Sequence, residues 1–384
     1  MIIGLDAIPL TETKTGVGHY TFELARALAA ASPSDEFVLL YPSRYAPVEL
    51  RAEDGAGLPA NLRATRVAVG PLGRHWWSIG LPRHLGRSRV DLFHGTNYDV
   101  PLWGERPAVL TVHDLSAFAW PETMLARRAR RLRRRLPLMA RCAAHVITPT
   151  EVIRGEACER LGLPSSKVTV VPEAPRRIFR PLSADESRAL LARFGVSENF
   201  ILAVGTIEPR KNLATLLRTF ELLARVEATP ADLSLVLAGR TGWLHEDFLT
   251  KVSSSALRER IHFTGYVTDE ELCALYSSCI AFVYPSLYEG FGLPPLEAMA
   301  CGAPVVASRI GAHLEVLGEE SASLFPPEDA RALAGEIGGL LADEGARRRL
   351  SARGRERAAR FTWERTARET LAVYEEVLKR AGGR

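Results

Sequence analysis

Residues 280–308 carry the clearest pattern in the chain and read Ile-Ala-Phe-Val-Tyr-Pro-Ser-Leu-Tyr-Glu-Gly-Phe-Gly-Leu-Pro-Pro-Leu-Glu-Ala-Met-Ala-Cys-Gly-Ala-Pro-Val-Val-Ala-Ser. The first five residues form an apolar run of strand length, and Gly290 and Gly292 open a loop where the backbone can approach a ligand. Two prolines after Leu293 sit where the first turn of a helix needs no amide donors, and Gly302 ends that helix. Residues 304–307 form the next apolar strand, so the stretch predicts a strand, a loop, a helix and a second strand.

Two carboxylates, Glu289 and Glu297, frame the loop of this unit. Both lie near the carboxyl end of a predicted parallel strand, which is the edge where open α/β sheets bind ligands. The helix start at Leu293 also directs free amide groups and a partial positive charge to this place, which suits a phosphate. An acidic residue near a helix N-terminus is favourable on its own, and this is the alternative explanation for Glu297. It does not account for Glu289, which lies between an aromatic strand and two glycines.

Seven residues, Gly-Phe-Gly-Leu-Pro-Pro-Leu, separate Glu289 from Glu297, and this spacing resembles the E-x7-E signature of retaining GT-B glycosyltransferases, especially family 4 (glycosyltransferase group 1). Residues 200–212, Phe-Ile-Leu-Ala-Val-Gly-Thr-Ile-Glu-Pro-Arg-Lys-Asn, resemble a second motif of that family. The chain looks most like bacterial polysaccharide mannosyltransferases. The resemblance implies an α/β protein of the GT-B fold, with two Rossmann-like, doubly wound domains facing a central cleft and a final helix that crosses back to the first domain.

Length and composition fit this expectation. The chain has 384 residues, enough for two ordinary domains, and its 47% hydrophobic and 24% charged residues are typical of a globular protein. Five scattered cysteines without a C-x-x-C pair support neither a zinc site nor a disulfide framework and favour a reducing compartment. The N-terminus lacks a signal-peptide pattern, and no uncharged apolar run reaches membrane-spanning length. We therefore expect a cytoplasmic protein.

Strands and helices alternate through two comparable halves, which is a doubly wound pattern. The predicted strands cover residues 2–8, 37–41, 64–69, 90–94, 108–113, 145–148 and 168–172 in the first half and 200–205, 233–238, 262–267, 280–284 and 304–307 in the second. Segment 173–181, rich in proline and arginine, is interpreted as a linker. We expect an acceptor-side domain over residues 1–178 and a nucleotide-sugar-binding domain over 179–364. By the resemblance, a C-terminal helix over 365–384 packs on the first domain.

Two features of the first half are candidates for substrate contact. Gly16, Val17 and Gly18 follow the first strand as a glycine loop that precedes a helix from about Tyr20, although such a fragment is equally well a plain tight turn. His113 follows an apolar strand, where a histidine is more often structural than catalytic. The resemblance implies that the loop faces the donor phosphates and the acceptor, and that His113 contacts hydroxyl groups of the donor sugar.

Arg210 and Lys211 are the clearest cationic pair, and they precede Asn212, a predicted helix cap. An Arg-Lys pair in a loop is usually a solvated surface feature. These two, however, are expected at the same sheet edge as Glu289. Cleavage of a sugar–diphosphate bond leaves negative charge on the departing nucleotide, which must be stabilised. The sequence has no Asp-x-Asp motif for a divalent metal, so Arg210, Lys211 and the helix start at Leu293 are expected to stabilise this charge without a metal, as in the resembled family.

Arg210, Lys211, Glu289 and His113 are accordingly the candidate catalytic residues, and no metal ligands are predicted. Glu289 would hold the donor sugar and Glu297 the ribose, because a carboxylate accepts hydrogen bonds from paired hydroxyl groups. In a glycosidase-like mechanism one of the two carboxylates would instead act as the nucleophile, and the spacing of Glu289 and Glu297 alone does not distinguish these two roles. The resemblance favours front-face attack without an enzyme nucleophile. The candidate donor-binding residues are Gly16, Val17, Gly18, Gly205, Glu208, Tyr266, Val267, Gly290, Phe291, Gly292, Leu293 and Glu297.

Residues 124–141 hold the strongest charge cluster, with seven arginines between Arg127 and Arg135 on a segment whose apolar residues recur at helical spacing. One interpretation is the solvated face of an ordinary packed helix. A second is a helix resting on anionic lipid, supported by Trp76 and Trp77, which the sequence suggests are exposed, and this would place the protein at the inner face of the plasma membrane. Nucleic-acid binding, a third interpretation, is disfavoured by a net charge of only +4 and the lack of a reading motif.

The function expected from these features is transfer of a sugar from a nucleotide diphosphate to a glycan or lipid-linked acceptor in cell-surface polysaccharide synthesis, with retention and without a metal or other cofactor. Mannose from GDP-mannose is the preferred donor, on the likeness of residues 16–18, 113–115 and 208–212 to polymer-assembling mannosyltransferases. The alternatives are a nucleotide-sugar epimerase on a similar scaffold and a non-enzymatic basic protein that binds membranes or nucleic acid.

Overall fold

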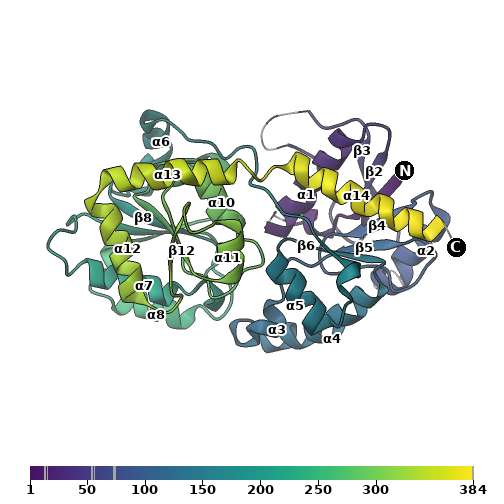
Figure 1. Ribbon diagram of the computed structural model, residues 1–384, viewed down its shortest axis with the longest axis horizontal. Helices are drawn as coiled ribbons and strands as arrows, with labels where there is room; N and C mark the ends of the chain where they lie inside the picture. The colour runs from purple at the N-terminus through teal and green to yellow at the C-terminus, as the bar shows by residue number, and fades with distance from the viewer. Residues whose placement is uncertain (13, 15, 53–54, 56, 72–74, 383–384) are drawn as a thin grey trace. The chain divides into compact units, whose positions relative to one another are not determined.

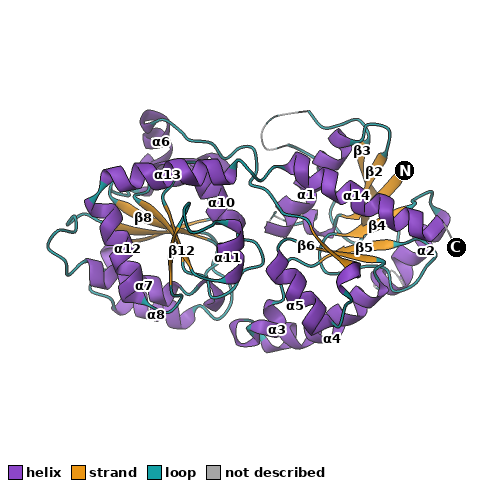
Figure 2. Cartoon of the chain, in the orientation of Figure 1, coloured by secondary structure: helices purple, strands orange, loops and turns teal. Residues whose placement is uncertain are grey.

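The computed structural model describes residues 1–12, 14, 16–52, 55, 57–71 and 75–382. The chain forms two compact units. Unit 1 contains residues 1–115, 130–174 and 361–384, and unit 2 contains residues 116–129 and 175–360. Each is a parallel sheet covered by helices (Figures 1 and 2), so the prediction of two Rossmann-like units is confirmed.

The sheet of unit 1 has strand order β3-β2-β1-β4-β5-β6-β7, with every described pair parallel. Its strands are β1 (Ile2–Asp6), β2 (Glu36–Pro42), β3 (Leu62–Val67), β4 (Leu92–Gly95), β5 (Ala108–Thr111), β6 (His145–Thr148) and β7 (Val168–Val170). β1 and β4 are neighbours although two strands separate them in the chain. The strand order therefore reverses between them, and side chains that follow their carboxyl ends are brought together.

Helices cover both faces of this sheet (Figure 1). They are α1 (Gly16–Ala31), α2 (Leu81–Arg87), the greater part of α4 (Ala126–Cys142), α5 (Glu151–Leu161) and α14 (Trp363–Gly382), with short turns η1 (Ile8–Leu10), η3 (Trp76–Gly80) and η5 (Ser165–Lys167). The last helix, α14, packs along α1 and buries Trp363 and Tyr374 in the same apolar cluster as β1 and β2. The end of the chain is thus part of unit 1.

The sheet of unit 2 has strand order β10-β9-β8-β11-β12-β13 and is also parallel. Its strands are β8 (Phe200–Val204), β9 (Ser234–Ala238), β10 (Ile261–Gly265), β11 (Ala281–Tyr284), β12 (Val305–Ser308) and β13 (Ser323–Phe325). Its helices are α3 (Ser116–Ala119), α6 (Ala184–Leu191), α7 (Leu213–Leu223), α8 (Glu246–Ser254), α9 (Asp269–Ser278), α10 (Leu293–Ala300), α11 (Gly311–Val316), α12 (Ala330–Ala342) and α13 (Glu344–Ala358). Short turns η4 (Pro121–Thr123), η6 (Ala192–Phe194), η7 (Pro209–Lys211) and η8 (Arg258–Arg260) connect them.

Two segments differ from the sequence-based expectation in how they are attached. Residues 116–129, expected with the first domain, lie with unit 2, where Trp243 donates its indole N–H to the carbonyl of Thr123 at 3.0 Å. The guanidinium of Arg128 also lies over the Trp243 ring. Segment 173–181 has no regular structure, as a linker should, but Glu173 and Arg176 within it are buried. Glu173 pairs with His113 and Arg176 with Asp269, so the first residues of this segment are fixed in place.

Two local predictions need correction, and one strand was missed. Gly16, Val17 and Gly18 do not form a loop, because α1 already begins at Gly16. Trp76 was expected to be exposed but is only 1% exposed. The π-helical turn η3 directs its indole into the apolar cluster that contains Leu81 and Phe93. The short strand β13 was not predicted. Among the described residues no helix is both long and apolar enough to cross a membrane.

Candidate active site

The candidate site of unit 2 lies where the strand order of its sheet reverses. β8 and β11 are neighbours in the sheet although β9 and β10 come between them in the chain. The carboxyl end of β8 leads to Arg210 and Lys211, and the carboxyl end of β11 leads to Glu289. Neighbouring parallel strands end at the same edge, and for this reason two loops 78 residues apart in sequence meet.

A short turn fixes the direction of the two cations. Arg210 and Lys211 lie in η7, which ends at Asn212 in the left-handed backbone region with φ 53°. The side-chain amide of Asn212 donates to the carbonyls of Pro285 at 3.1 Å and Pro327 at 2.7 Å. Asn212 is the N-cap residue of α7, as predicted, but its side chain makes no capping hydrogen bond and instead ties η7 to the loop that carries Glu289.

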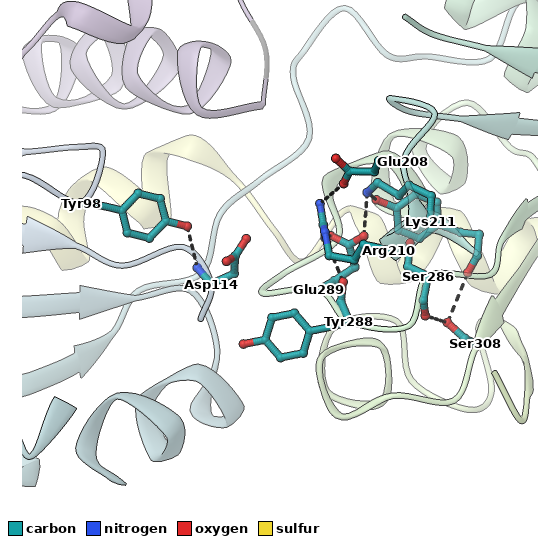
Figure 3. Close-up of polar contacts among 10 residues, drawn as sticks. Tyr98, Asp114, Glu208, Arg210, Lys211, Ser286, Tyr288, Glu289 and Ser308 are labelled. Atoms are coloured by element: carbon teal, nitrogen blue, oxygen red, sulfur yellow. Dashed lines mark hydrogen bonds and ion pairs between the residues drawn. The ribbon is translucent and has the colours of Figure 1, made fainter. Parts of the chain in front are cut away.

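Glu289 binds both cations (Figure 3). The Lys211 ammonium lies 2.6 Å from one oxygen of Glu289, and the Arg210 guanidinium lies 2.8 Å from the other. Arg210 also contacts Glu208 at 2.8 Å and donates to the Tyr288 carbonyl at 2.9 Å, while Lys211 is 2.5 Å from the Tyr284 hydroxyl. The structure thus joins four predicted site residues in one cluster, in which two cations face two carboxylates.

The electrostatics of this cluster keep Glu289 ionised. Burial alone would raise the pKa of Glu289, but Arg210 and Lys211 outweigh this effect and hold it well below its ordinary value. Burial lowers the pKa of Lys211, and the carboxylate of Glu289 opposes that shift. The side chains of Lys211 and Glu289 are only 11% and 10% exposed, so neither is the solvated surface group that a loop position usually indicates.

The N-terminus of α10 lies beside the loop that carries Glu289. Its N-cap is Gly292, whose φ of 97° suits glycine, and no side chain caps the helix there. Pro294 and Pro295 carry no N–H, so the backbone amide of Leu293 and the positive end of the helix dipole are what α10 offers to a phosphate here. Gly290, Phe291 and Gly292 are all buried in this loop.

A histidine that sequence reasoning missed lies against this loop. His313 on α11 is fully buried, and its Nδ1 donates to the Ser308 carbonyl at 2.7 Å. Burial lowers the pKa of His313 to about 4, so its ring is neutral with the lone pair on Nε2. Nε2 of His313 lies close to the backbone of Gly292, since it would be 3.6 Å from a β-carbon added there. The carbonyl partner, Ser308, is itself fixed by a hydrogen bond from its hydroxyl to the Ser286 carbonyl (Figure 3). No motif in the sequence indicated His313.

Glu297 lies inside α10 and is held by a residue from the segment that connects the two units. The Arg176 guanidinium contacts Glu297 at 3.4 Å and Asp269 at 2.7 Å. Arg176 is 7% exposed and Glu297 8%, so this is a buried ionic group. The role of Glu297 toward a ribose stays a prediction, and the structure adds that a cation already orients it.

The remaining donor-binding candidates of unit 2 follow β8 and β10. Gly205 has a φ of 142°. The backbones after β8 and β9 approach closely here, because a β-carbon added to Gly239 would lie only 2.1 Å from the carbonyl oxygen of Gly205. Tyr266 is 57% exposed with the Arg240 guanidinium over its ring, whereas Val267 is buried. These positions surround the carboxyl edge of the sheet, where the cluster lies.

In unit 1, His113 follows β5 and is held at both ring nitrogens. Nδ1 is 2.9 Å from Glu173, and Nε2 is 2.8 Å from the Thr96 carbonyl. A carboxylate and a carbonyl oxygen only accept hydrogen bonds, so both ring nitrogens of His113 must carry a proton to form these two bonds. Although burial alone would lower the pKa of His113, Glu173 outweighs that effect and raises it. A hydroxyl group of a substrate could bind His113 only if one of these bonds opened. Nearby, Tyr98 accepts the amide of Asp114 through its hydroxyl at 3.1 Å (Figure 3).

The chain has two doubly wound parallel sheets, and in one of them a pair of cations lies at a strand-order reversal beside an uncapped helix N-terminus. This combination is that of the GT-B glycosyltransferases. Comparison with known proteins agrees. The family "Glycosyltransferase Family 4" matches residues 14–174, and "Glycosyl transferases group 1" matches residues 192–357.

Similar proteins extend over the whole chain. O-antigen chain mannosyltransferase B of Escherichia coli is 32% identical over 95% of this chain and 97% of its own length. The MMP alpha-(1->4)-mannosyltransferase of Mycolicibacterium hassiacum is 32% identical over 71% of this chain and 66% of its own length. The structure of sucrose-phosphate synthase from Thermosynechococcus elongatus superposes with a TM-score of 0.78 at 25% identity, covering 99% of both chains. The chain belongs to the group 1, family 4 glycosyltransferases.

Proposed function

We propose that this glycosyltransferase transfers mannose from GDP-mannose to a glycan or lipid-linked acceptor in cell-surface polysaccharide synthesis, with retention and without a metal ion. The observation that carries the proposal is the cluster of Arg210, Lys211 and Glu289 beside the N-terminus of α10. The choice of mannose is supported by the similarity to O-antigen chain mannosyltransferase B and to the mycobacterial mannosyltransferase.

The cations and the helix start would act on the leaving nucleotide. When the bond between the sugar and the diphosphate breaks, negative charge accumulates on the departing phosphate oxygen. The amide of Leu293, the helix dipole of α10 and the charges of Arg210 and Lys211 are in place before the reaction, so they stabilise this charge without reorganisation. This is the work that a divalent metal does in other transferases.

Glu289 would act mainly by position. It keeps Arg210 and Lys211 oriented, and its remaining lone pairs can accept hydrogen bonds from hydroxyl groups of the donor sugar. Its ionised state at neutral pH suits an acceptor of hydrogen bonds. In front-face transfer the acceptor oxygen bonds to the anomeric carbon on the side that the diphosphate leaves, and the acceptor proton passes to the departing phosphate oxygen. No enzyme nucleophile is needed.

A nucleotide panel tests the donor. GDP and GDP-mannose should raise the melting temperature of the protein, whereas UDP-glucose and ADP-glucose at equal concentration should raise it less, because a ligand stabilises the state that binds it. A larger shift with the uridine or adenine nucleotides would assign another donor.

Product analysis separates transfer from its alternatives. GDP-mannose incubated with the enzyme alone should keep its sugar configuration, since an epimerase would change it without an acceptor. With a mannose-ended oligosaccharide as acceptor, NMR should show an α-linked product from the α-linked donor. A β-linked product would contradict retention.

A further inference from the structure

Helix α4 of unit 1 presents a row of arginines without acidic neighbours on the same helix. Its sequence, Ala-Arg-Arg-Ala-Arg-Arg-Leu-Arg-Arg-Arg-Leu-Pro-Leu-Met-Ala-Arg-Cys, contains no Asp or Glu. Arg128 lies over Trp243, and Arg135 pairs with Asp99 at 2.6 Å. In the described part of the chain, the exposed residues Arg131, Arg134 and Arg141 form no ion pair with a carboxylate, although the charge of Arg131 acts on Asp99 at longer range. Their charge is therefore available to an outside partner.

The same side of α4 also exposes apolar groups. Leu136, Met139 and Ala140 are buried against unit 1, whereas Leu138 is 49% exposed. Arg134, Leu138 and Cys142 are spaced four residues apart and therefore lie along one side of the helix. An exposed leucine within a row of arginines is not needed for a merely solvated helix face.

A tryptophan from another part of unit 1 adjoins this side. Trp103, in the loop between β4 and β5, is 57% exposed while its indole N–H donates to the Ser78 carbonyl at 2.7 Å. The thiol of Cys142 contacts the Leu102 carbonyl at 3.7 Å, which places this loop against the last turn of α4. Trp103 is thus held in place, with its ring on the surface beside the basic row. We call Trp103, Leu138, Cys142, Arg131, Arg134 and Arg141 the Trp103 face.

We propose that the Trp103 face docks unit 1 on an anionic lipid bilayer. Arginines attract acidic headgroups, leucine enters the acyl boundary, and tryptophan is favoured at the interface because its ring is apolar and its N–H is polar. A soluble polyanion would use the arginines but gain little from Trp103 and Leu138. The combination of both kinds of group is what selects the bilayer as the partner.

The residues of this face differ from those suggested by sequence. Trp76 is buried and Trp77 packs on Phe93, so neither forms the insertion site. Arg135 is held by Asp99, so replacing it would also disturb the fold. The last turn of α4 leads into the amino end of β6, the sheet edge opposite to the one that His113 follows. Changes at Leu138 and Cys142 should therefore leave the candidate binding residues of unit 1 intact.

Vesicle sedimentation tests the proposal with the full chain. At low salt the protein should sediment with phosphatidylglycerol vesicles and remain in solution with phosphatidylcholine vesicles, and salt should weaken the binding as it screens the arginines. The triple variant Arg131→Gln, Arg134→Gln, Arg141→Gln should bind phosphatidylglycerol about a hundredfold more weakly, at roughly fivefold per arginine. Trp103→Ala and Leu138→Gln should each weaken it about threefold to tenfold.

Matched variants in unit 2 control for net charge and exposed apolar area. Arg348, Arg349 and Arg353 on α13 are exposed, and Val226 is 54% exposed. Replacing the three arginines by Gln, or Val226 by Gln, should leave vesicle binding unchanged. Thermal melting of every variant shows whether it has kept its fold, and GDP-induced stabilisation should be the same in all of them.

Contact with lipid can be observed directly at Cys142, which is exposed. An environment-sensitive fluorophore on Cys142 should shift to the blue with phosphatidylglycerol vesicles. An unchanged spectrum with full sedimentation would overturn the proposal, because binding would then use another surface. Equal loss of binding in the α13 variant would overturn it as well. Binding that heparin removes and that Trp103→Ala and Leu138→Gln do not affect would assign the arginines to a soluble polyanion instead.

Discussion

The ammonium group of Lys211 lies 2.6 Å from the Glu289 carboxylate, although 78 residues separate them in the chain. The contact exists because β8 and β11 are neighbours and end at the same edge of the sheet. It places a positive and a negative charge, each on a side chain that is only about a tenth exposed, in one site beside the start of α10. A function for each charge can therefore be tested by removing one partner at a time.

Replacing Lys211 or Arg210 by Ala should lower turnover by roughly two to four powers of ten, as for loss of a preorganised contact to transition-state charge. Single-turnover rates of mannosyl transfer measure the effect. Arg218→Ala, which removes a cation from α7 outside the cluster, is the control and should keep the wild-type rate. Melting curves are needed beside the rates, because Arg210→Ala leaves the buried Glu208 without its partner. Near-normal rates in both variants would exclude the cations from stabilising the leaving group.

Replacing Glu289 by Gln should preserve GDP binding and impair transfer. The variant keeps the size of the side chain but removes the counter-charge of Arg210 and Lys211, so the cations become more available to a diphosphate. Isothermal titration with GDP should give an affinity equal to or higher than that of the wild type, while the transfer rate falls. A collapse of GDP affinity would mean that Glu289 contacts the nucleotide rather than the sugar.

Transfer should survive chelation by EDTA, since Arg210, Lys211 and the helix start would supply the charge stabilisation that a metal otherwise gives. Rates measured before and after chelation, and after return of magnesium or manganese, decide the question. Loss of transfer on chelation, restored by either ion, would refute metal independence.

The stretch around Glu289 shows how far a sequence can predict such a site. Apolar runs, Gly290, Gly292 and the two prolines were enough to predict β11, its loop, α10 and β12, because each residue type has a strong local preference. The capping boxes that Ser183 and Thr268 form with a glutamate three residues later depend on equally local preferences. That Arg210 and Lys211 share an edge with Glu289 followed from the parallel alternation alone.

The parts that could not be predicted depend on tertiary contacts. Nothing local shows that Tyr284 faces Lys211 or that His313 lies against Gly292. Arg176 lies in a segment with the composition of a linker, yet it is buried between two carboxylates. Trp76 was misjudged because its neighbours are basic and polar, whereas the turn η3 sets its direction. In each case packing across the unit, rather than sequence pattern, determines the environment.

Removing Arg176 should destabilise unit 2 strongly. Arg176→Met removes the cation that contacts the buried carboxylate of Glu297 and the half-buried carboxylate of Asp269, and breaking a buried ion pair typically costs roughly 3–5 kcal/mol. Urea denaturation measures the loss. Arg188→Met, whose ion pair with Asp185 is exposed, should cost well under about 1 kcal/mol and serves as the control. A small effect of Arg176→Met would show that water, rather than Arg176, satisfies the two carboxylates.

The contact between His113 and Glu173 predicts a pH-dependent stability. Burial alone would lower the pKa of His113, but Glu173 outweighs it, so the folded-state pKa lies above the ordinary value of 6.5. A raised folded-state pKa means that the folded state binds the proton more tightly than the unfolded state. The stabilisation is therefore fully present below 6.5 and is lost as the pH rises through the folded-state pKa.

His113→Gln should consequently lower the free energy of unfolding more at about pH 6 than at about pH 9, and denaturation at both values measures the difference. His145 provides a control of opposite sign, because burial lowers its pKa and its folded state therefore resists protonation. His145→Gln should cost less at the lower pH than at the higher one. An equal loss for His113→Gln at both values would show that His113 stays neutral between Glu173 and Thr96, and that one of its two contacts is not a hydrogen bond in solution.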